Sequence, residues 1–147
     1  MSVLKLKLDN DDITSAFFDE IRILGIVSPM QDYMFSWNVN KHLGMNFRIN
    51  TSMEIQLRKK NRNYFFSIYD CQPENRALVH FLYSNQYEGE YLLPELKHLD
   101  YLWLMKNDTV SDKEIGELMH AIKKIPGVQL VMEMQPSKIK NKQHLIF

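Results

Sequence analysis

Several residue types and patterns that would decide a class of function are missing from this sequence. One cysteine, Cys71, among 147 residues excludes an internal disulfide and agrees with a reducing compartment. The five glycines are isolated from one another, which excludes a phosphate-binding loop and a dinucleotide fingerprint. No His-x-x-x-His, Cys-x-x-Cys or Gly-x-Ser-x-Gly pattern occurs. We therefore expect no cofactor, no metal and no catalytic residue, and an enzyme is the less favoured class.

An excess of one charge is missing as well, since 18 Lys and Arg residues balance 18 Asp and Glu residues. Proteins dedicated to nucleic-acid binding usually carry a strongly basic surface, so the balance argues against that class. The longest nearly apolar run, residues 77–83, is far shorter than the ~20 residues that cross a bilayer. Leucine and lysine alternate from Leu4 to Leu8, unlike the continuous apolar stretch of a signal peptide. These features predict a cytoplasmic protein that does not cross a membrane.

Apolar and aromatic residues are abundant. They make up 45% and 12% of the chain, which is enough for one full core at this length without disulfides or metal. No repeat, linker or low-complexity segment divides the sequence. We therefore predict a single domain over residues 1–135, followed by a polar and mobile C-terminal tail over residues 136–147.

Period-two alternation of apolar and polar residues predicts most of a sheet. Residues 45–93 show this alternation in short segments separated by turn residues, which indicates an antiparallel meander. Further strands are expected at 4–8, 21–27, 99–105 and 128–134. Because the segment 99–105 is apolar on both faces, we expect it to lie at the centre. The predicted class is α+β with a mostly antiparallel sheet.

Two helices are predicted to pack on this sheet. The first runs over about 29–43, with Ser28 as its N-cap and Gly44 as a left-handed stop. The second runs over about 111–124, where a Ser-x-x-Glu capping box precedes an apolar stripe at helical spacing. It lies between the last two predicted strands, so the chain should end in a strand–helix–strand unit.

The segment Leu93-Pro-Glu-Leu-Lys-His-Leu-Asp-Tyr101 resembles the motif for which the IPExxxVDY family of Bacteroidota-type bacteria is named. Leucine replaces the isoleucine at 93 and the valine at 99 of that motif. The resemblance extends along the chain to Asp32-Tyr33, Trp37, Asn40, the Leu43-Gly44 helix end and the aromatic strand that ends at Tyr69. It implies a small cytoplasmic bacterial protein and leaves the biochemical activity open.

The motif contains two carboxylates that are candidates for a site. Glu95 should lie near the positive end of a helical turn that Pro94 opens, and it shares a face of that turn with His98. This is half of a Glu-x-x-His metal site, but the second half is missing. Asp100 enters the predicted central strand, where a buried carboxylate needs a partner. Capping of backbone amides or pairing with lysine is favoured over a catalytic role.

The resemblance also suggests a pocket between this motif and the first helix. Asn40 would lie at the polar margin of that helix, where it could line a pocket with Glu95 and Asp100. Tyr33 and Trp37 are four residues apart, and we expect them to pack on the sheet. The candidate pocket residues are Asp32, Trp37, Asn40, Glu95, His98, Asp100 and Tyr101.

A basic hairpin tip is the one concentration of charge. It consists of Arg58, Lys59, Lys60 and Arg62, and aromatic residues follow at 64–66. Basic side chains beside aromatic rings can hold phosphates and stack bases of RNA. The favoured alternative is a solvated hairpin end whose aromatic residues point into the core.

Three functions therefore remain open. The first is a non-catalytic module that binds an unidentified protein partner, or itself in a homo-oligomer, through a sheet edge or the face of helix 29–43. The nine methionines suit an adaptable surface, although they can equally fill the core. The second is an RNA-associated accessory protein that uses the basic hairpin tip, and the third is a small-molecule binder or enzyme around the motif. We rank them in that order.

Overall fold

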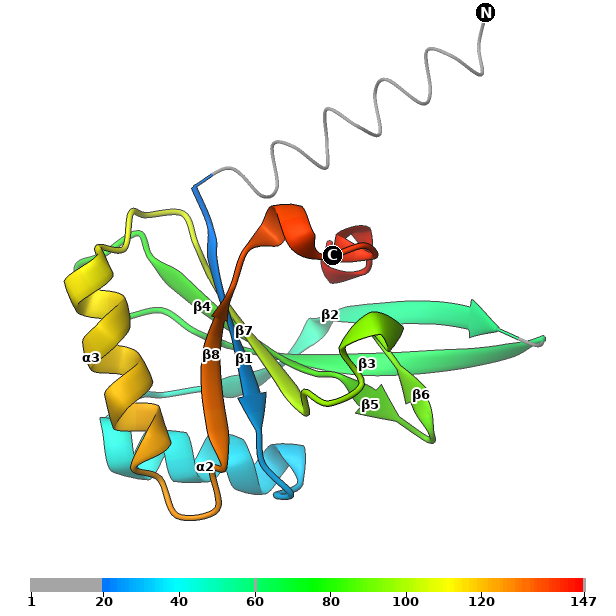
Figure 1. Ribbon diagram of the computed structural model, residues 1–147, viewed down its shortest axis with the longest axis horizontal. Coiled ribbons are helices and arrows are strands. Elements are labelled where there is room, and N and C mark those ends of the chain that lie inside the picture. The colour runs from blue at the N-terminus through cyan, green and yellow to red at the C-terminus, as the bar shows by residue number, and fades with distance from the viewer. Residues whose placement is uncertain (1–19, 60, 147) are drawn as a thin grey trace, which may run out of the picture.

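The computed structural model describes residues 20–59 and 61–146, which form a six-stranded antiparallel sheet with two α-helices on one face (Figure 1). The strands of this sheet are β1 (Arg22–Val27), β2 (Arg48–Lys59), β3 (Arg62–Cys71), β4 (Val79–Ser84), β7 (Tyr101–Lys106) and β8 (Leu130–Met134), and a separate hairpin consists of β5 (Gln86–Tyr87) and β6 (Glu90–Tyr91). The helices are α2 (Asp32–Leu43) and α3 (Asp112–Lys123), with short 3-10 turns at η1 (Pro94–Leu96), η2 (Pro136–Lys138) and η3 (Lys142–Leu145). The predicted α+β class is confirmed. The strand predicted at 4–8 lies outside the described residues.

The strand order is β2-β3-β4-β7-β1-β8, and every neighbouring pair is antiparallel. Strands β2, β3 and β4 form a meander as predicted, and Figure 1 shows β2 and β3 extending beyond the rest of the sheet. Because β7 and β8 are both antiparallel to β1, they run parallel to each other on its two sides, and α3 connects them. This is the predicted strand–helix–strand unit, with β1 inserted between its strands.

The core consists of two layers of apolar side chains, one on each face of the sheet. On the helix-covered face, Phe35 and Val39 of α2 and Ile115 and Ile122 of α3 are buried against the strands. On the opposite face, the segment around η1 and the C-terminal segment cover the strands instead of helices. Strand β7 is buried as far as Met105 because it has a layer on both sides, as expected of a central strand.

The C-terminal segment differs from the mobile polar tail predicted for residues 136–147. Within the described part, Ile139 is 4% exposed and Leu145 is fully buried in the layer opposite the helices. The Tyr83 hydroxyl donates a hydrogen bond of 2.9 Å to the carbonyl oxygen of Leu145. The prediction followed the many polar residues of this segment, whereas its few apolar residues cover the face that the helices leave open.

The helix ends follow the predicted caps in part. Helix α2 begins three residues later than predicted, with Gln31 as its N-cap in place of Ser28. It ends at Gly44, whose φ of 67° is the left-handed conformation expected there. At the start of α3 the Ser111 hydroxyl accepts a hydrogen bond of 3.2 Å from the amide of Glu114. No helix in the described ranges is long and apolar enough to cross a membrane.

Candidate functional site

A cleft of about 720 Å³ opens between the loop that leads into α2, the middle of β3 and the β5–β6 hairpin. Its lining residues are Ser28 to Asp32, Phe65 to Ser67, Ser84, Gln86 to Gly89, Asp100 and Tyr101. Of the seven predicted pocket residues, the structure therefore brings Asp32, Asp100 and Tyr101 together. This volume suits a small organic group or a short stretch of polypeptide.

Asp100 lies just before β7 and joins the cleft to the sheet. Its carboxylate Oδ2 accepts a hydrogen bond of 2.8 Å from the amide of Ser28. Its own amide donates to the carbonyl of Ile26, and its carbonyl accepts from the amide of Asn85, at 2.8 and 2.9 Å. The side chain thus holds the turn after β1, which is the backbone-capping contact that the sequence favours.

Two tyrosines line or adjoin the cleft beside carboxylates. The Tyr69 hydroxyl donates to Asp32 Oδ2 at 3.2 Å, while the Tyr101 hydroxyl donates to the carbonyl of Met30 and its ring stacks on Phe35 at 4.4 Å between centroids. Burial, followed by the charge of Asp32, raises the pKa of Tyr69 to about 12. Burial also raises the pKa of Tyr101, and the charges of Asp32 and Asp100 add to the effect. Both phenols are therefore neutral hydrogen-bond donors near pH 7 and not bases.

Glu95 and His98 do not reach the cleft. Both carboxylate oxygens of Glu95 accept hydrogen bonds of 2.8 Å from Asn141, one from its amide and one from its side chain. Burial alone would raise the pKa of Glu95, but these hydrogen bonds outweigh it and lower the pKa. His98 is exposed to solvent. No group of three or more metal-ligating side chains occurs among the described residues.

Asn40 also lies away from the cleft and closes the loop after α2. Its side-chain oxygen accepts from the amide of Phe47 at 2.7 Å, and its side-chain nitrogen donates to the carbonyl of Phe47 at 3.0 Å. The hypothesis that Asn40 and Glu95 line a pocket with Asp100 is therefore wrong. Asn40 fixes the path from α2 into β2, and Glu95 fixes the C-terminal segment.

Tyr33 and Trp37 lie on the solvent side of α2 and not on the sheet. Tyr33 is 62% exposed and Trp37 is 55% exposed, so the expectation that they pack on the sheet is wrong. Phe35 and Val39 have the same four-residue spacing and make that contact instead. We call Tyr33, Met34, Trp37 and Lys41 the α2 outer face; the Lys41 ammonium lies 5.1 Å from the centre of the Trp37 ring.

Asn85 was not predicted from the sequence, although the motif is built around it. This residue has no exposed surface. Its side-chain nitrogen donates to the carbonyls of Leu96 and Leu99, both at 2.9 Å, and its side-chain oxygen accepts from the amide of Leu93 at 2.8 Å. An asparagine after an apolar strand indicates only a turn in sequence, so no local signal identifies this role.

Two of the cations at the basic hairpin tip form ion pairs with the β5–β6 hairpin. Lys59 pairs with Glu90 at 3.3 Å, and Arg62 pairs with Glu88. The Arg62 guanidinium also lies 5.4 Å from the centre of the Tyr64 ring. Of the three aromatic residues that follow, only Phe65 is exposed. The arrangement agrees with the favoured alternative of a hairpin end whose aromatic residues mostly enter the core.

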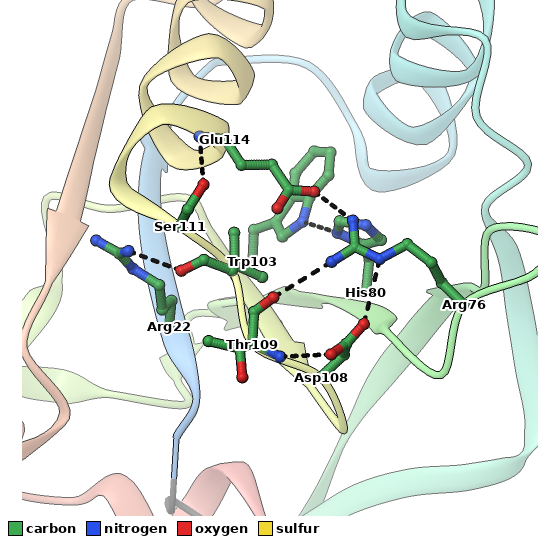
Figure 2. A network of polar contacts seen from close by, with 9 residues as sticks. Arg22, Arg76, His80, Trp103, Asp108, Thr109, Ser111 and Glu114 are labelled. Carbon is green, nitrogen blue, oxygen red and sulfur yellow. Dashed lines mark hydrogen bonds and ion pairs between the residues drawn. The ribbon is translucent and has the colours of Figure 1, made fainter.

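A buried histidine belongs to a polar network at the other end of the sheet (Figure 2). His80 Nδ1 accepts a hydrogen bond of 2.9 Å from Trp103 Nε1. Burial, followed by the charge of Arg76, lowers the pKa of His80 to about 4. Arg76 pairs with Asp108 at 3.3 Å and with Glu114, and so ties the loop before β4 to the start of α3. His80 is a neutral structural acceptor that lies outside the cleft.

Comparison with family models and with curated proteins identifies no relative of this chain. No family model matches the sequence, and no curated protein is significantly similar to it. The resemblance to the IPExxxVDY family therefore stays a prediction. The functional argument rests on the cleft and on the α2 outer face.

Proposed function

We propose that this protein is a non-catalytic interaction module that binds a protein partner through the α2 outer face. The observation that carries the proposal is the exposure of Tyr33 by 62%, Met34 by 43% and Trp37 by 55% on one helix. Together they expose apolar and aromatic surface on the order of 400 Å², which is the size of the largest patch on a typical monomer and is often functional. Tyrosine and tryptophan are also the residues enriched at binding hot spots.

None of these three side chains belongs to either layer of the core. Phe35 and Val39 fill the contact between α2 and the sheet and have no exposed surface. A helix normally places polar residues on its solvent side, because exposed aromatic rings gain nothing from folding. Burial by a partner would give the outer face the stabilisation that it lacks in the monomer. An interface centred on one helix is small, which favours a reversible association over a permanent one.

The setting of this activity is also a proposal. The single cysteine and the resemblance to the IPExxxVDY family support a bacterial cytoplasm. Within it the partner is another protein, or a second copy of this chain in a homo-oligomer. RNA is the less favoured partner because two cations of the basic hairpin tip already have acidic partners.

The test is affinity purification of the full-length protein from its own cell lysate, with and without nuclease. We expect a stoichiometric protein partner that survives nuclease and is lost from the Tyr33→Ala/Trp37→Ala variant. The matched control is Ile49→Ala, which removes an apolar side chain that is 51% exposed on β2 instead.

A partner retained by Tyr33→Ala/Trp37→Ala and lost from Ile49→Ala would move the interface to the β2 edge. Retention that disappears with nuclease would favour the RNA-associated function. A monomer that retains nothing under either condition would contradict the proposal.

A further inference from the structure

Among the described residues, the charged side chains that line the cleft are all acidic. Asp32, Glu88 and Asp100 contribute carboxylates, and no lysine, arginine or histidine of residues 20–59 and 61–146 belongs to the lining. Glu88 is neutralised by Arg62, which stands outside the lining. Asp32 and Asp100 form no ion pair with any residue in the described ranges. Their hydrogen-bond partners are neutral, namely the Tyr69 hydroxyl and backbone amides.

Two further observations show what kind of group would suit this space. Phe65 of β3 and Tyr87 of β5 both belong to the lining of the cleft, and each residue is 39% exposed. Tyr87 is held in place by an edge contact with Phe66 at 6.2 Å between centroids. Aromatic faces attract cations, and most strongly those that shed water easily. The negative charge also acts on the neighbouring phenols. Burial raises the pKa of Tyr69 and of Tyr101, and the charge of Asp32 raises both further, joined by Asp100 in the case of Tyr101.

We propose that the cleft binds the guanidinium group of an arginine side chain on the protein partner. Guanidinium is planar and weakly hydrated. It can stack on Phe65, which is on the same face of β3 as Tyr69, while it donates to Asp32 or Asp100. The cleft and the α2 outer face are neighbours along the chain, because the lining includes Met30, Gln31 and Asp32 and the next residue is Tyr33. One partner can therefore cover the helix and insert a basic side chain beside it. The inference rests on the proposed function and specifies the chemistry of the partner.

The test is a titration of isotope-labelled full-length protein with the peptide acetyl-Gly-Arg-Gly-amide, followed by NMR. We expect saturable shifts at the amides of residues 28–32 and 86–89. The matched peptide acetyl-Gly-Gln-Gly-amide should cause none. Asp100→Asn keeps an oxygen that can accept from the Ser28 amide. Asp32→Asn keeps an oxygen for the Tyr33 amide, and its side-chain amide can donate to the Tyr69 hydroxyl. We expect the double variant to bind the arginine peptide about tenfold more weakly. The control Glu117→Gln removes an exposed carboxylate on α3 and should leave binding unchanged.

The single variant Asp32→Asn keeps the test decisive if the double variant fails to fold, and thermal unfolding of each variant checks this. Equal shifts with the glutamine peptide, or affinity unchanged in Asp32→Asn and the double variant, would overturn the inference. Tighter binding of agmatine than of the arginine peptide would assign the cleft to a free small cation and overturn the protein source.

The same variants separate this inference from the proposed function. If the partner is lost from Tyr33→Ala/Trp37→Ala but retained by a folded Asp32→Asn/Asp100→Asn, the interaction module stands and the arginine site does not. If both variants lose the partner while both remain folded, both proposals are supported.

Discussion

The motif segment at 93–101 and the α2 outer face each differ from what their sequences suggest. The motif suggests a functional site but is structural, and the outer face suggests a core contact but is exposed. The motif carries carboxylates, a histidine and a tyrosine in a distinctive pattern, yet Glu95 and Asp100 hold backbone amides in place. The four-residue spacing of Tyr33 and Trp37 is typical of a helix face that packs in a core, yet both aromatic rings are exposed to solvent. A distinctive polar motif can therefore specify how chain segments join, whereas an ordinary aromatic pair can be the surface left free for a partner.

The largest effect that sharpens this comparison should come from Asn85, whose side chain binds the backbone of the motif. Asn85→Ala removes a buried side chain that satisfies two carbonyls and one amide. Because these backbone groups would stay buried without partners, we expect a loss of about 4 kcal/mol in the free energy of unfolding. Urea denaturation measures it. Asn63→Ala, at an exposed position on β3, is the control and should change stability by less than about 0.5 kcal/mol.

The next effect concerns His80, a buried histidine that accepts a hydrogen bond from Trp103. Its pKa is lowered to about 4 in the folded protein, and the unfolded chain binds the proton near pH 6.5. Neutral, buried His80 therefore contributes about 3 kcal/mol to the free energy of unfolding. This contribution is fully present above pH 6.5 and is lost as the pH falls toward 4. Urea midpoints between pH 7 and pH 4.5 should show this decline. His80→Gln should flatten it, and an unchanged slope in that variant would contradict the assignment.

A smaller effect is expected at Asp100, where loss of the acceptor can be separated from loss of charge. Asp100→Ala leaves the Ser28 amide without its partner and should cost about 2 kcal/mol. Asp100→Asn keeps an acceptor oxygen and should cost less than about 1 kcal/mol. Thermal or urea unfolding compares the two variants. Equal losses would mean that the charge, and not the capping contact, stabilises the turn.

The smallest effect is expected on the α2 outer face. Trp37→Ala should change the free energy of unfolding by less than about 0.5 kcal/mol, because the side chain is 55% exposed. Phe35→Ala, two residues away on the buried side, should cost about 3 to 4 kcal/mol through the cavity it leaves. A large loss in Trp37→Ala would show that the monomer itself uses the outer face and would weaken the comparison.

Local signals in the sequence predicted the architecture well. Alternation over 45–93 gave the meander, and a segment apolar on both sides gave the central strand β7. Gly44 marked the end of α2, where it adopts the left-handed conformation, and Ser111 marked the start of α3, where it caps the helix. These features depend on neighbours a few residues apart, which the sequence displays directly.

The candidate site was less predictable because its residues depend on distant partners. In α2, Tyr33 and Trp37 have the same spacing as Phe35 and Val39, so periodicity alone does not say which pair faces the sheet. The role of Asn85 depends on backbone groups 8 to 14 residues further along the chain. The cleft joins the loop before α2 with β3 and the β5–β6 hairpin, and that juxtaposition exists only after folding.

The position of β1 has a consequence for the order in which the protein folds. Ile23 pairs with Leu104 on one side and with Met134 on the other, so the first described strand sits between two of the last. Pairings across such sequence separations close long loops and form slowly, whereas the β2–β3–β4 meander needs only short ones. We expect the meander to gain protection from pulsed hydrogen exchange before β1 does. The finished sheet would then be assembled from one flank, with β1 as the strand that joins the edge strand β8 to the other four.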